Sequence, residues 1–552
     1  MADPFRVPNL ITNYLAALLL LVCAAPLPGR QRTFAGLGDH TRPISTKSAE
    51  AQALFNQGLA FLYSFNHDEA IRSFEQALQH DPKSTPLYWA IALAHGPHIN
   101  FPLVDEVHAQ AAWKNLQAAK HHSAQATPVE RDLLAALESR YANPQPEDRK
   151  PLDIAYAESM RKVWRKYPTD PDVGALFAEA LMDLWPWDLW TAEGTMQPDT
   201  AEVLETLERV LGLQPDHPLA LHLYVHALEA SPFPERAALA AERLRDLQPG
   251  LGHMVHMPSH IDVRLGAWRR AIEANEKAIE ADRAYRLLSP EQGFYRNYMA
   301  HNHHMLAFSA MMQGQNRRAT DQINRMLAEI PETWLEQNAV FVDGMFTMPY
   351  EMHIRFGRWE QILQEPEPPA YLPITQAFRH FARGVAYAAK QEVALARAEQ
   401  QAFRTAKEQL PETAIFVQNP ASNVLAVADQ MLEGEILFRE HNPDAALNAL
   451  RQAVQLEDQL RYIEPPDWIQ PVRHVLGATL MEVKQYEEAE QVYRQDLKRH
   501  PHNGWSLHGL ARSLRAQGRT AEASAVQIEF EQAWSSADTK LTSSCFCLPG
   551  RE

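Results

Sequence analysis

The chain has 552 residues, enough for several domains or for one long repeat array. Its 52 Lys and Arg stand against 69 Asp and Glu, a formal net charge of −17. This acidic balance argues against a nucleic-acid partner, because no excess of cations is available to displace phosphate counterions. Three cysteines are too few for a disulfide framework.

The N-terminus carries an apolar run from Leu15 to Ala25, followed by Pro26 and Gly29. The run is short for a bilayer-spanning helix but suits the core of a secretory signal. Residues 1–29 are therefore predicted to be a signal-like segment that directs export to the periplasm or the exterior. The residues before Cys23 faintly resemble a lipobox, which leaves a membrane anchor open as an alternative. Residues 30–48 are predicted to be a linker.

The next segment has small and aromatic residues at fixed spacings, with Gly58, Ala70, Phe74 and Pro82 at positions 8, 20, 24 and 32 of a 34-residue unit. This pattern resembles the tetratricopeptide repeat (TPR), a pair of antiparallel helices. Small residues let the two helices approach closely, the aromatic ring fills the gap, and proline ends the second helix.

The same period returns later in the chain. Positions 8, 20, 24 and 32 are filled again by Gly477, Ala489, Tyr493 and Pro501. We predict an all-α fold, a right-handed superhelix of TPR helix pairs over residues 49–538, with degenerate or lengthened units around residues 100–200 and 330–460. Residues 539–552 are predicted to be a tail. A 14-residue insertion after Ala284 could form a lid over the groove.

Histidine is unusually frequent, with 24 residues. When Ala237, Ala271 and Ala319 are placed at position 20 of three successive repeats, seven histidines fall at positions 2, 5 or 9. Residues at these positions share one helix face, and the TPR resemblance implies that this face lines the concave groove. This set is called the histidine file below: His222, His226, His253, His256, His260, His301 and His304. His303 falls at position 4 and is expected to point elsewhere.

The histidine file predicts a transition-metal site. Neutral imidazole is the commonest ligand of such ions, and pairs at i and i+4 chelate from one helix face. A set built almost only of imidazoles favours copper, with zinc or iron less favoured, and disfavours calcium or magnesium. Glu229 and Asp262 are the carboxylates expected near the file. By analogy with paired-histidine dicopper oxidases, a metal-dependent oxidoreductase acting on a small molecule is the leading functional hypothesis.

Two other interpretations remain open. Groove histidines can be hydrogen-bonded fillers, although seven in register are crowded for that role. Alternatively, the groove binds a peptide or a phosphorylated group, and the protein is a non-catalytic TPR scaffold for protein–protein interaction. The chain lacks a phosphate-binding glycine loop, a G-x-S-x-G elbow and an H-E-x-x-H helix, so no catalytic residue is assigned.

The run from Gly252 to His260, with its H-M-P-S-H motif at residues 256–260, is similar to a subfamily of bacterial, often exported TPR proteins. That resemblance implies architecture and export, but no reaction. Three further features are predicted to be mainly structural: the aromatic segment from Trp185 to Trp190 as a packing plug, Glu351 as at most an extra ligand, and the C-x-C pair at Cys545 as incidental.

Overall fold

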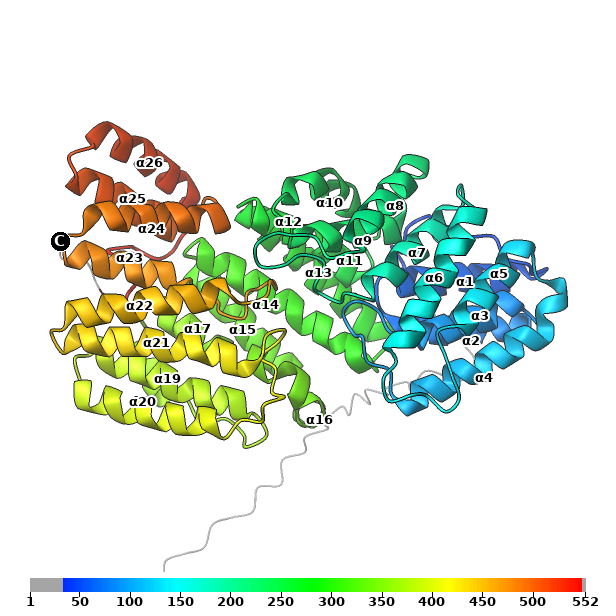
Figure 1. The fold of residues 1–552 in the computed structure, drawn as a ribbon, viewed down its shortest axis with the longest axis horizontal. Helices are drawn as coiled ribbons and strands as arrows, with labels where there is room; N and C mark the ends of the chain where they lie inside the picture. Colours follow the sequence, from blue (N-terminus) through cyan, green and yellow to red (C-terminus); the bar gives the residue numbers. More distant parts are fainter. Residues whose placement is uncertain (1–32, 549–552) are drawn as a thin grey trace, which may run out of the picture. The chain divides into compact units, whose positions relative to one another are not determined.

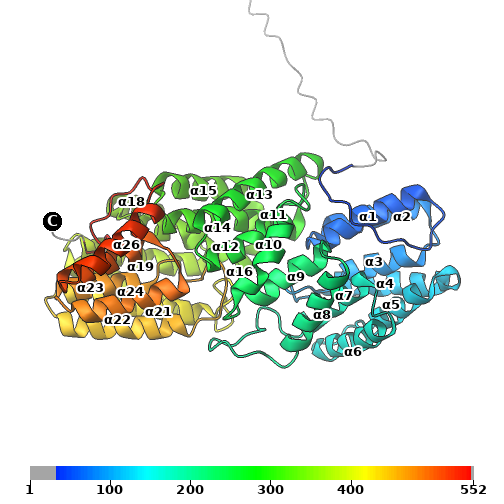
Figure 2. The ribbon, with the colours of Figure 1, turned by 90° about the horizontal axis from the view of Figure 1, so that it is seen from above.

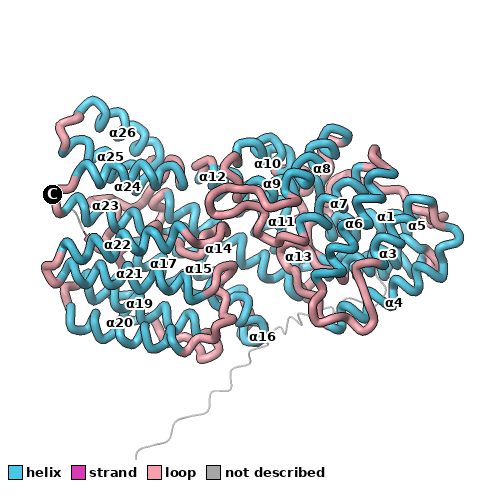
Figure 3. Tube along the Cα trace, in the orientation of Figure 1, coloured by secondary structure: helices cyan, strands magenta, loops and turns pink. Residues whose placement is uncertain are grey.

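The computed structural model describes residues 33–548, and the predicted signal-like segment 1–29, with Cys23, lies outside this range. Within the described range every regular element longer than an isolated β-bridge is a helix (Figure 3). None of these helices is both long and apolar enough to cross a membrane. The predicted all-α class is therefore confirmed.

Consecutive helices pack as antiparallel pairs along the chain (Figures 1 and 2). The first helices of the pairs are α1 (Ala49–Tyr63), α3 (Thr85–Ala94), α5 (Pro128–Glu138), α7 (Pro171–Met182), α9 (Pro218–Glu229), α11 (Gly252–His256) with α12 (Pro258–Arg264), α14 (Arg296–Met312), α17 (Met348–Arg355), α19 (Pro373–Ala389), α21 (Ala421–Arg439), α23 (Val472–Glu482) and α25 (Gly504–Ala516).

The second helices pack against them in turn. They are α2 (His67–His80), α4 (Glu106–His122), α6 (Lys150–Lys166), α8 (Thr200–Leu213), α10 (Ala238–Leu244), α13 (Trp268–Leu288), α15 (Asn316–Glu329), α18 (Trp359–Gln364), α20 (Val393–Glu408), α22 (Pro443–Asp458), α24 (Tyr486–Arg499) and α26 (Thr520–Ala533). An extra helix, α16 (Glu332–Val342), precedes α17, and short 3-10 turns lie at Ser123–Gln125, Pro234–Ala237, Gly293–Tyr295 and Asp343–Thr347.

The insertion after Ala284 does not form a separate lid. It lengthens α13 to 21 residues and then turns at Gly293–Tyr295 into α14. The extended end of α13 reaches α2, where Tyr285 donates a hydrogen bond to Glu69 over 3.1 Å. The added residues therefore connect a middle repeat to the first repeat.

The small residues at repeat position 8 are required by packing, as the sequence pattern implied. A Cβ added to Gly58 would lie 2.4 Å from the ring of Phe74, and one added to Gly477 would lie 2.5 Å from the ring of Tyr493. Each pair joins positions 8 and 24 of one repeat. The aromatic ring thus occupies the space that the missing side chain leaves.

The segments before and after the repeats pack against them. In residues 33–48 the carbonyl of Gly36 accepts from the Gly250 amide over 2.8 Å, and Arg42 binds Asp170 and Asp172 at 2.8 and 3.0 Å. At the other end, Cys545 and Cys547 are buried in the C-terminal core and joined by a disulfide. In the described range, both segments are therefore packed against the repeats.

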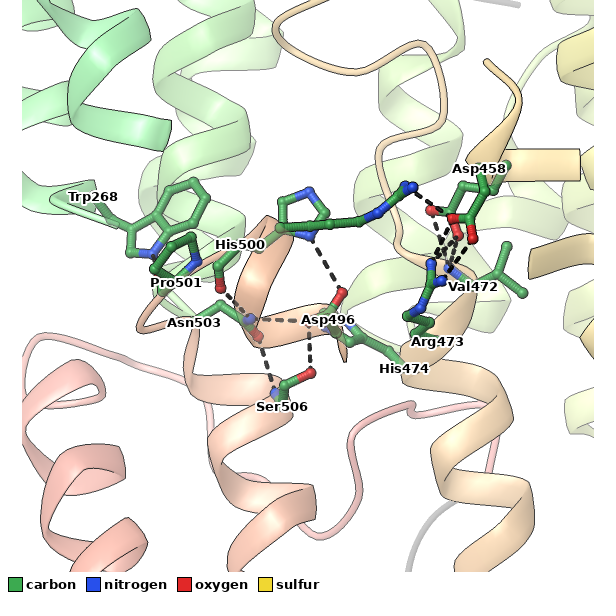
Figure 4. Close-up of polar contacts among 12 residues, drawn as sticks. Trp268, Asp458, Val472, Arg473, His474, Asp496, His500, Pro501, Asn503 and Ser506 are labelled. Carbon is green, nitrogen blue, oxygen red and sulfur yellow. Dashed lines mark hydrogen bonds and ion pairs between the residues drawn. The ribbon is translucent and has the colours of Figure 1, made fainter. Parts of the chain in front are cut away.

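A buried carboxylate organises the C-terminal repeats (Figure 4). Asp496 of α24 accepts from the Ser506 hydroxyl at 2.6 Å and the Asn503 amide at 3.0 Å, and it lies 2.8 Å from His474 Nε2. Beside this cluster the indole of Trp268, in α13, donates to the Pro501 carbonyl over 2.9 Å. The C-terminal repeats are thereby tied to the middle of the chain.

Gly58→Ala is expected to lower the free energy of unfolding by about 1–3 kcal/mol, because the added methyl group overlaps the Phe74 ring. Gly212→Ala in α8 is the matched control, since a Cβ there meets nothing within 4 Å. The control should raise stability by up to about 1 kcal/mol through helix propensity. Chemical denaturation of both variants measures the difference, and equal shifts would contradict the packing explanation.

Candidate metal centre

The histidine file lies on the first helices of three successive repeats, and these helices pack side by side. In the middle repeat the first helix is divided into α11 and α12. His222 and His226 are on α9, His253 and His256 are on α11, and His260 is on α12. The last two, His301 and His304, are on α14. Helix α12 contacts α9, and α11 contacts α14. The predicted common face across three repeats is therefore present.

A proline divides the middle helix of the file. Helix α11 ends at His256 and α12 begins at Pro258, with Met257 between them in helical conformation. Pro258 has no amide hydrogen to donate to the carbonyl four residues earlier, and its ring crowds that carbonyl. His253 and His256 lie before this break and His260 lies after it.

The first histidine triad is His222, His226 and His253, whose nearest nitrogens lie within 4.8 Å of one another. Nδ1 of His222 donates to the Tyr63 carbonyl over 2.8 Å, and Nδ1 of His226 donates to the Glu229 carboxylate over 2.7 Å. Each of these rings therefore turns its Nε2 inward, and the Nε2 atoms of His222 and His253 lie 3.1 Å apart.

The second histidine triad is His256, His260 and His301, again with nitrogens within 4.8 Å. Nδ1 of His256 donates to the Asn275 side-chain oxygen over 2.7 Å. The orientation of that amide is fixed, because its nitrogen donates to the Ala271 carbonyl. Nε2 of His256 lies 2.9 Å from Nε2 of His260. His301 is half-buried, and its ring centroid lies 4.7 Å from that of His256.

Two carboxylates hold His260 from outside the triads. Its Nδ1 lies 2.8 Å from Glu229 and 3.3 Å from Glu464. Because the other oxygen of Glu229 accepts from His226, one carboxylate joins the two triads. The ring centroids of His226 and His260 lie 6.2 Å apart. These three groups could themselves hold a cation, but both carboxylates already face the protonated side of an imidazole.

This arrangement leaves some buried nitrogens unpaired, although the Nε2 atoms of His222 and His253 share a hydrogen bond, as do those of His256 and His260. An imidazole that donates from Nδ1 presents an unprotonated Nε2 unless it carries a charge. In the first triad Nε2 of His226 and Nδ1 of His253 are buried without any hydrogen-bond partner. A buried nitrogen without a partner costs about 1–3 kcal/mol. Three imidazoles with nitrogens within 4.8 Å of one another, two of them oriented through Nδ1 by the oxygens of Tyr63 and Glu229, could supply the donor set that a transition-metal ion needs.

Burial also keeps most of the file neutral. It lowers the pKa far below its ordinary value for four imidazoles, those of His222, His253, His256 and His301. Burial lowers the pKa of His304 to about 3. For His260 burial acts in the same direction, but Glu229 and Glu464 outweigh it and raise the pKa to about 10. The metal-free centre thus carries one protonated ring, paired with Glu229, whose own pKa falls to about 2 despite burial.

One histidine of the file, His304, lies outside both triads. His304 is buried, and its ring centroid is 6.5 Å from that of His301. His303 points away, as expected from its repeat position, and pairs with Gln322 at 2.9 Å. Glu351 belongs to neither triad. Its carboxylate accepts a hydrogen bond from the Thr347 hydroxyl.

Sequence reasoning missed Phe65, which forms the apolar wall of the first triad. Its ring centroid lies 4.4 Å from His222, 5.8 Å from His253 and 6.1 Å from His226. Its φ of 59° is in the left-handed region, which costs a bulky residue about 1–2 kcal/mol. Glycine fills the equivalent turn in four later repeats, at Gly266, Gly314, Gly357 and Gly518. The sequence offered one signal for this role, because Phe65 occupies a turn position at which those four repeats have glycine.

Glu464 and Asn275 were also missed. Glu464 lies on the connection between α22 and α23, 204 residues from His260, and no local pattern marks it. Asn275 follows the repeat pattern of α13 as an ordinary polar residue. Trp187, by contrast, belongs to the aromatic segment that was predicted to plug an irregular repeat, and its ring packs edge-on against His226 with centroids 5.4 Å apart.

Other clusters of metal-ligating residues in the described range are already satisfied. Asp172 lies between His40 and His217, but the Arg42 guanidinium donates to it and supplies the positive charge. Cys545 and Cys547 stand near Glu435, but their sulfurs form a disulfide. Neither cluster offers the unpaired nitrogens of the histidine triads.

A family model for the tetratricopeptide repeat matches residues 51–84, the region of α1 and α2. The chain carries a tetratricopeptide repeat. Its start agrees with the register that places Gly58 at position 8, and the later helix pairs continue the same arrangement. No curated protein sequence matches the chain.

Several solved structures are similar to it in fold. A human IFIT1 dimer with PPP-AAAA has 13% identity and a TM-score of 0.33, covering 86% of this chain and 88% of that chain. The APC/C hetero-tetramer Cut9-Hcn1 has 15% identity and a TM-score of 0.33, covering 90% and 79%. Yeast Tom70 has 11% identity and a TM-score of 0.28, covering 87% and 90%. Similarity at this level says nothing about a ligand or an activity.

Phe65→Gly is expected to lower the free energy of unfolding by about 1–4 kcal/mol. Removing a buried phenylalanine ring costs about 3–5 kcal/mol, and relief of the left-handed backbone returns about 1–2 kcal/mol. Gln391→Gly is the matched control, because Gln391 has a φ of 65° in the equivalent turn but an exposed side chain. Gln391→Gly should not lose stability in chemical denaturation, because relief of the left-handed backbone, about 1–2 kcal/mol, is offset only in part by glycine's extra chain entropy of about 0.5–1 kcal/mol. An equal loss in both variants would show that Phe65 contributes nothing to packing.

Proposed function

We propose that the protein is an exported TPR metalloprotein that holds two transition-metal ions, one in each histidine triad, and acts as a copper-dependent oxidoreductase. The observation that carries this proposal is that two adjoining histidine triads each bring three imidazole nitrogens within 4.8 Å of one another. In the first triad, Nε2 of His226 and Nδ1 of His253 are in addition buried without a hydrogen-bond partner.

The ligand atoms of the two triads determine which metal the centre favours. Each triad supplies three imidazole nitrogens, while the nearby carboxylates Glu229 and Glu464 face the opposite side of the rings. Imidazole donors suit copper, zinc, iron and nickel, and copper binds such sites most strongly among divalent ions of the series. Calcium and magnesium prefer oxygen ligands and are disfavoured.

The protein's own groups fix the geometry of the centre. The Tyr63 carbonyl, Asn275 and Glu229 hold the Nδ1 side of four rings and thereby orient the coordinating side. Three ligands per ion leave coordination positions free, and ions bound there would supply electron transfer and activation of dioxygen or water. Phe65 and the buried helix faces exclude bulk water from the first triad.

The proposal predicts about two transition-metal ions per chain in untagged protein, measured by elemental analysis. His222→Ala/His226→Ala and His256→Ala/His260→Ala should each remove about one ion, because each double variant destroys one triad. His380→Ala is the control, since His380 pairs with Glu399 on α19 and α20, outside the centre. Protein that is metal-free after purification and after incubation with copper or zinc salts would contradict the proposal and favour a non-catalytic TPR scaffold.

The proposed export leads to a separate prediction. Protein recovered from the periplasmic or culture fraction should begin near Gly29, because the apolar run from Leu15 to Ala25 would be removed with the signal. Mass spectrometry of the intact protein measures the mature N-terminus. Replacing Leu18 and Leu20 with Arg should abolish export, whereas the same change at the exposed residues Leu287 and Leu395 should not. Recovery of full-length chain in the cytoplasm alone would contradict export.

A further inference from the structure

A cavity of about 80 Å³ opens beside the two triads. Five histidines of the file line it, together with Trp187, Tyr298 and loop residues that precede α21 and α23. Tyr298 of α14 packs on His253 with ring centroids 4.6 Å apart. A molecule in this cavity would therefore contact both triads at once.

Polar atoms without partners are concentrated on the walls of this cavity. The indole nitrogen of Trp187, the hydroxyl of Tyr298 and the side-chain oxygens of Asn100 and Asn297 are all buried and make no hydrogen bond. The Asn100 amide lies near the Tyr298 hydroxyl, but the two are not aligned for a hydrogen bond. Buried polar groups are normally paired, so an unpaired group from each of four residues facing one cavity indicates a polar occupant.

The remaining walls limit the charge of that occupant. No Lys or Arg lines the cavity, and its one carboxylate, Glu464, is paired with His260. An anion would find no cation there beyond the paired ring of His260, and a cation would face neutral imidazoles. Apolar side chains complete the lining, among them Met345, Val417 and Ile463. The cavity therefore suits an uncharged molecule with one polar end and one apolar body.

The volume limits its size. One water-sized group needs about 10–15 Å³ on this measure, so 80 Å³ holds roughly five to eight such groups. The indole of Trp187 donates, whereas the Tyr298 hydroxyl can donate or accept and the asparagine oxygens accept. A hydroxyl group, which is both donor and acceptor, satisfies this set with the fewest atoms.

We infer that the cavity binds a small, uncharged, hydroxyl-bearing compound of about five to eight non-hydrogen atoms, a phenol or a small alcohol. Trp187, Asn297 and Tyr298 hold its hydroxyl group, and Met345, Val417 and Ile463 contact its apolar body. That this compound is the substrate of the metal centre rests on the proposed function, whereas its binding follows from the cavity alone.

Phenol, benzene and benzoate test the inference as probes of nearly equal size. Their dissociation constants are measured by ligand-observed NMR titration on zinc-loaded protein, which cannot oxidise them, and on chelator-treated protein. Phenol should bind at least about fivefold more tightly than benzene, through the hydrogen bonds it alone makes, and on chelator-treated protein more tightly than benzoate, because the cavity lining contains no Lys or Arg and no metal ion is left to bind the carboxylate. Tyr298→Phe should remove most of this preference while leaving the zinc content unchanged.

Tyr350→Phe is the matched control, because Tyr350 is a buried tyrosine that lies outside the cavity. It should leave phenol binding unchanged. Asn297→Ala provides a second, independent loss of affinity if Tyr298→Phe folds poorly. Equal affinities for phenol and benzene, or full phenol affinity in both cavity variants, would overturn the inference and leave water as the occupant. Failure of the proposed function looks different: phenol would still bind in a Tyr298-dependent way to protein that retains no zinc.

Discussion

The shared carboxylate of Glu229 is the contact on which the centre depends. One oxygen accepts from His226 on its own helix, and the other faces Nδ1 of His260 on the next repeat. Without it His226 would lose the hydrogen bond of its Nδ1, and His260 would keep only Glu464 on its Nδ1 side. Removing one partner of a buried charged pair costs several kcal/mol, mostly because the other charge is left unpaired. A single side chain therefore contacts one ring of each triad and links the two.

The repeat architecture accounts for the placement of the histidines but not for the enclosure of the centre. Stacked first helices bring equivalent positions of neighbouring repeats side by side, so a histidine at one position recurs nearby at each repeat. The walls of the centre come from helices and loops that are distant in the sequence. Helix α1 contacts α9, which places Tyr63 and Phe65 on the first triad, and the connection between α22 and α23 places Glu464 on the second. In the simplest repeat arrays each unit contacts only its neighbours, and this chain departs from that pattern.

The repeat period in the sequence predicted the class of fold, the register and the common face of the histidine file, because close packing of Gly58 on Phe74 leaves a regular signal. Local sequence could not predict which partners close the centre. The contact of Glu464 with His260 spans 204 residues, and a glutamate before two prolines looks like any loop. The insertion after Ala284 was expected as a lid, and instead its first residues extend α13 to Leu288, after which Ser289 and Pro290 end the helix.

The distance along the chain between the walls of the centre has a consequence for biosynthesis. Tyr63 is made early, and Glu464 is made when most of the chain has left the ribosome. The first triad can assemble on a nascent chain, but the second cannot be complete until the connection before α23 has folded back onto α12. Metal acquisition by the whole centre would then follow chain completion, and in an exported protein it would follow passage across the membrane. The ion supply of the receiving compartment, and not that of the cytoplasm, would determine which metal is bound.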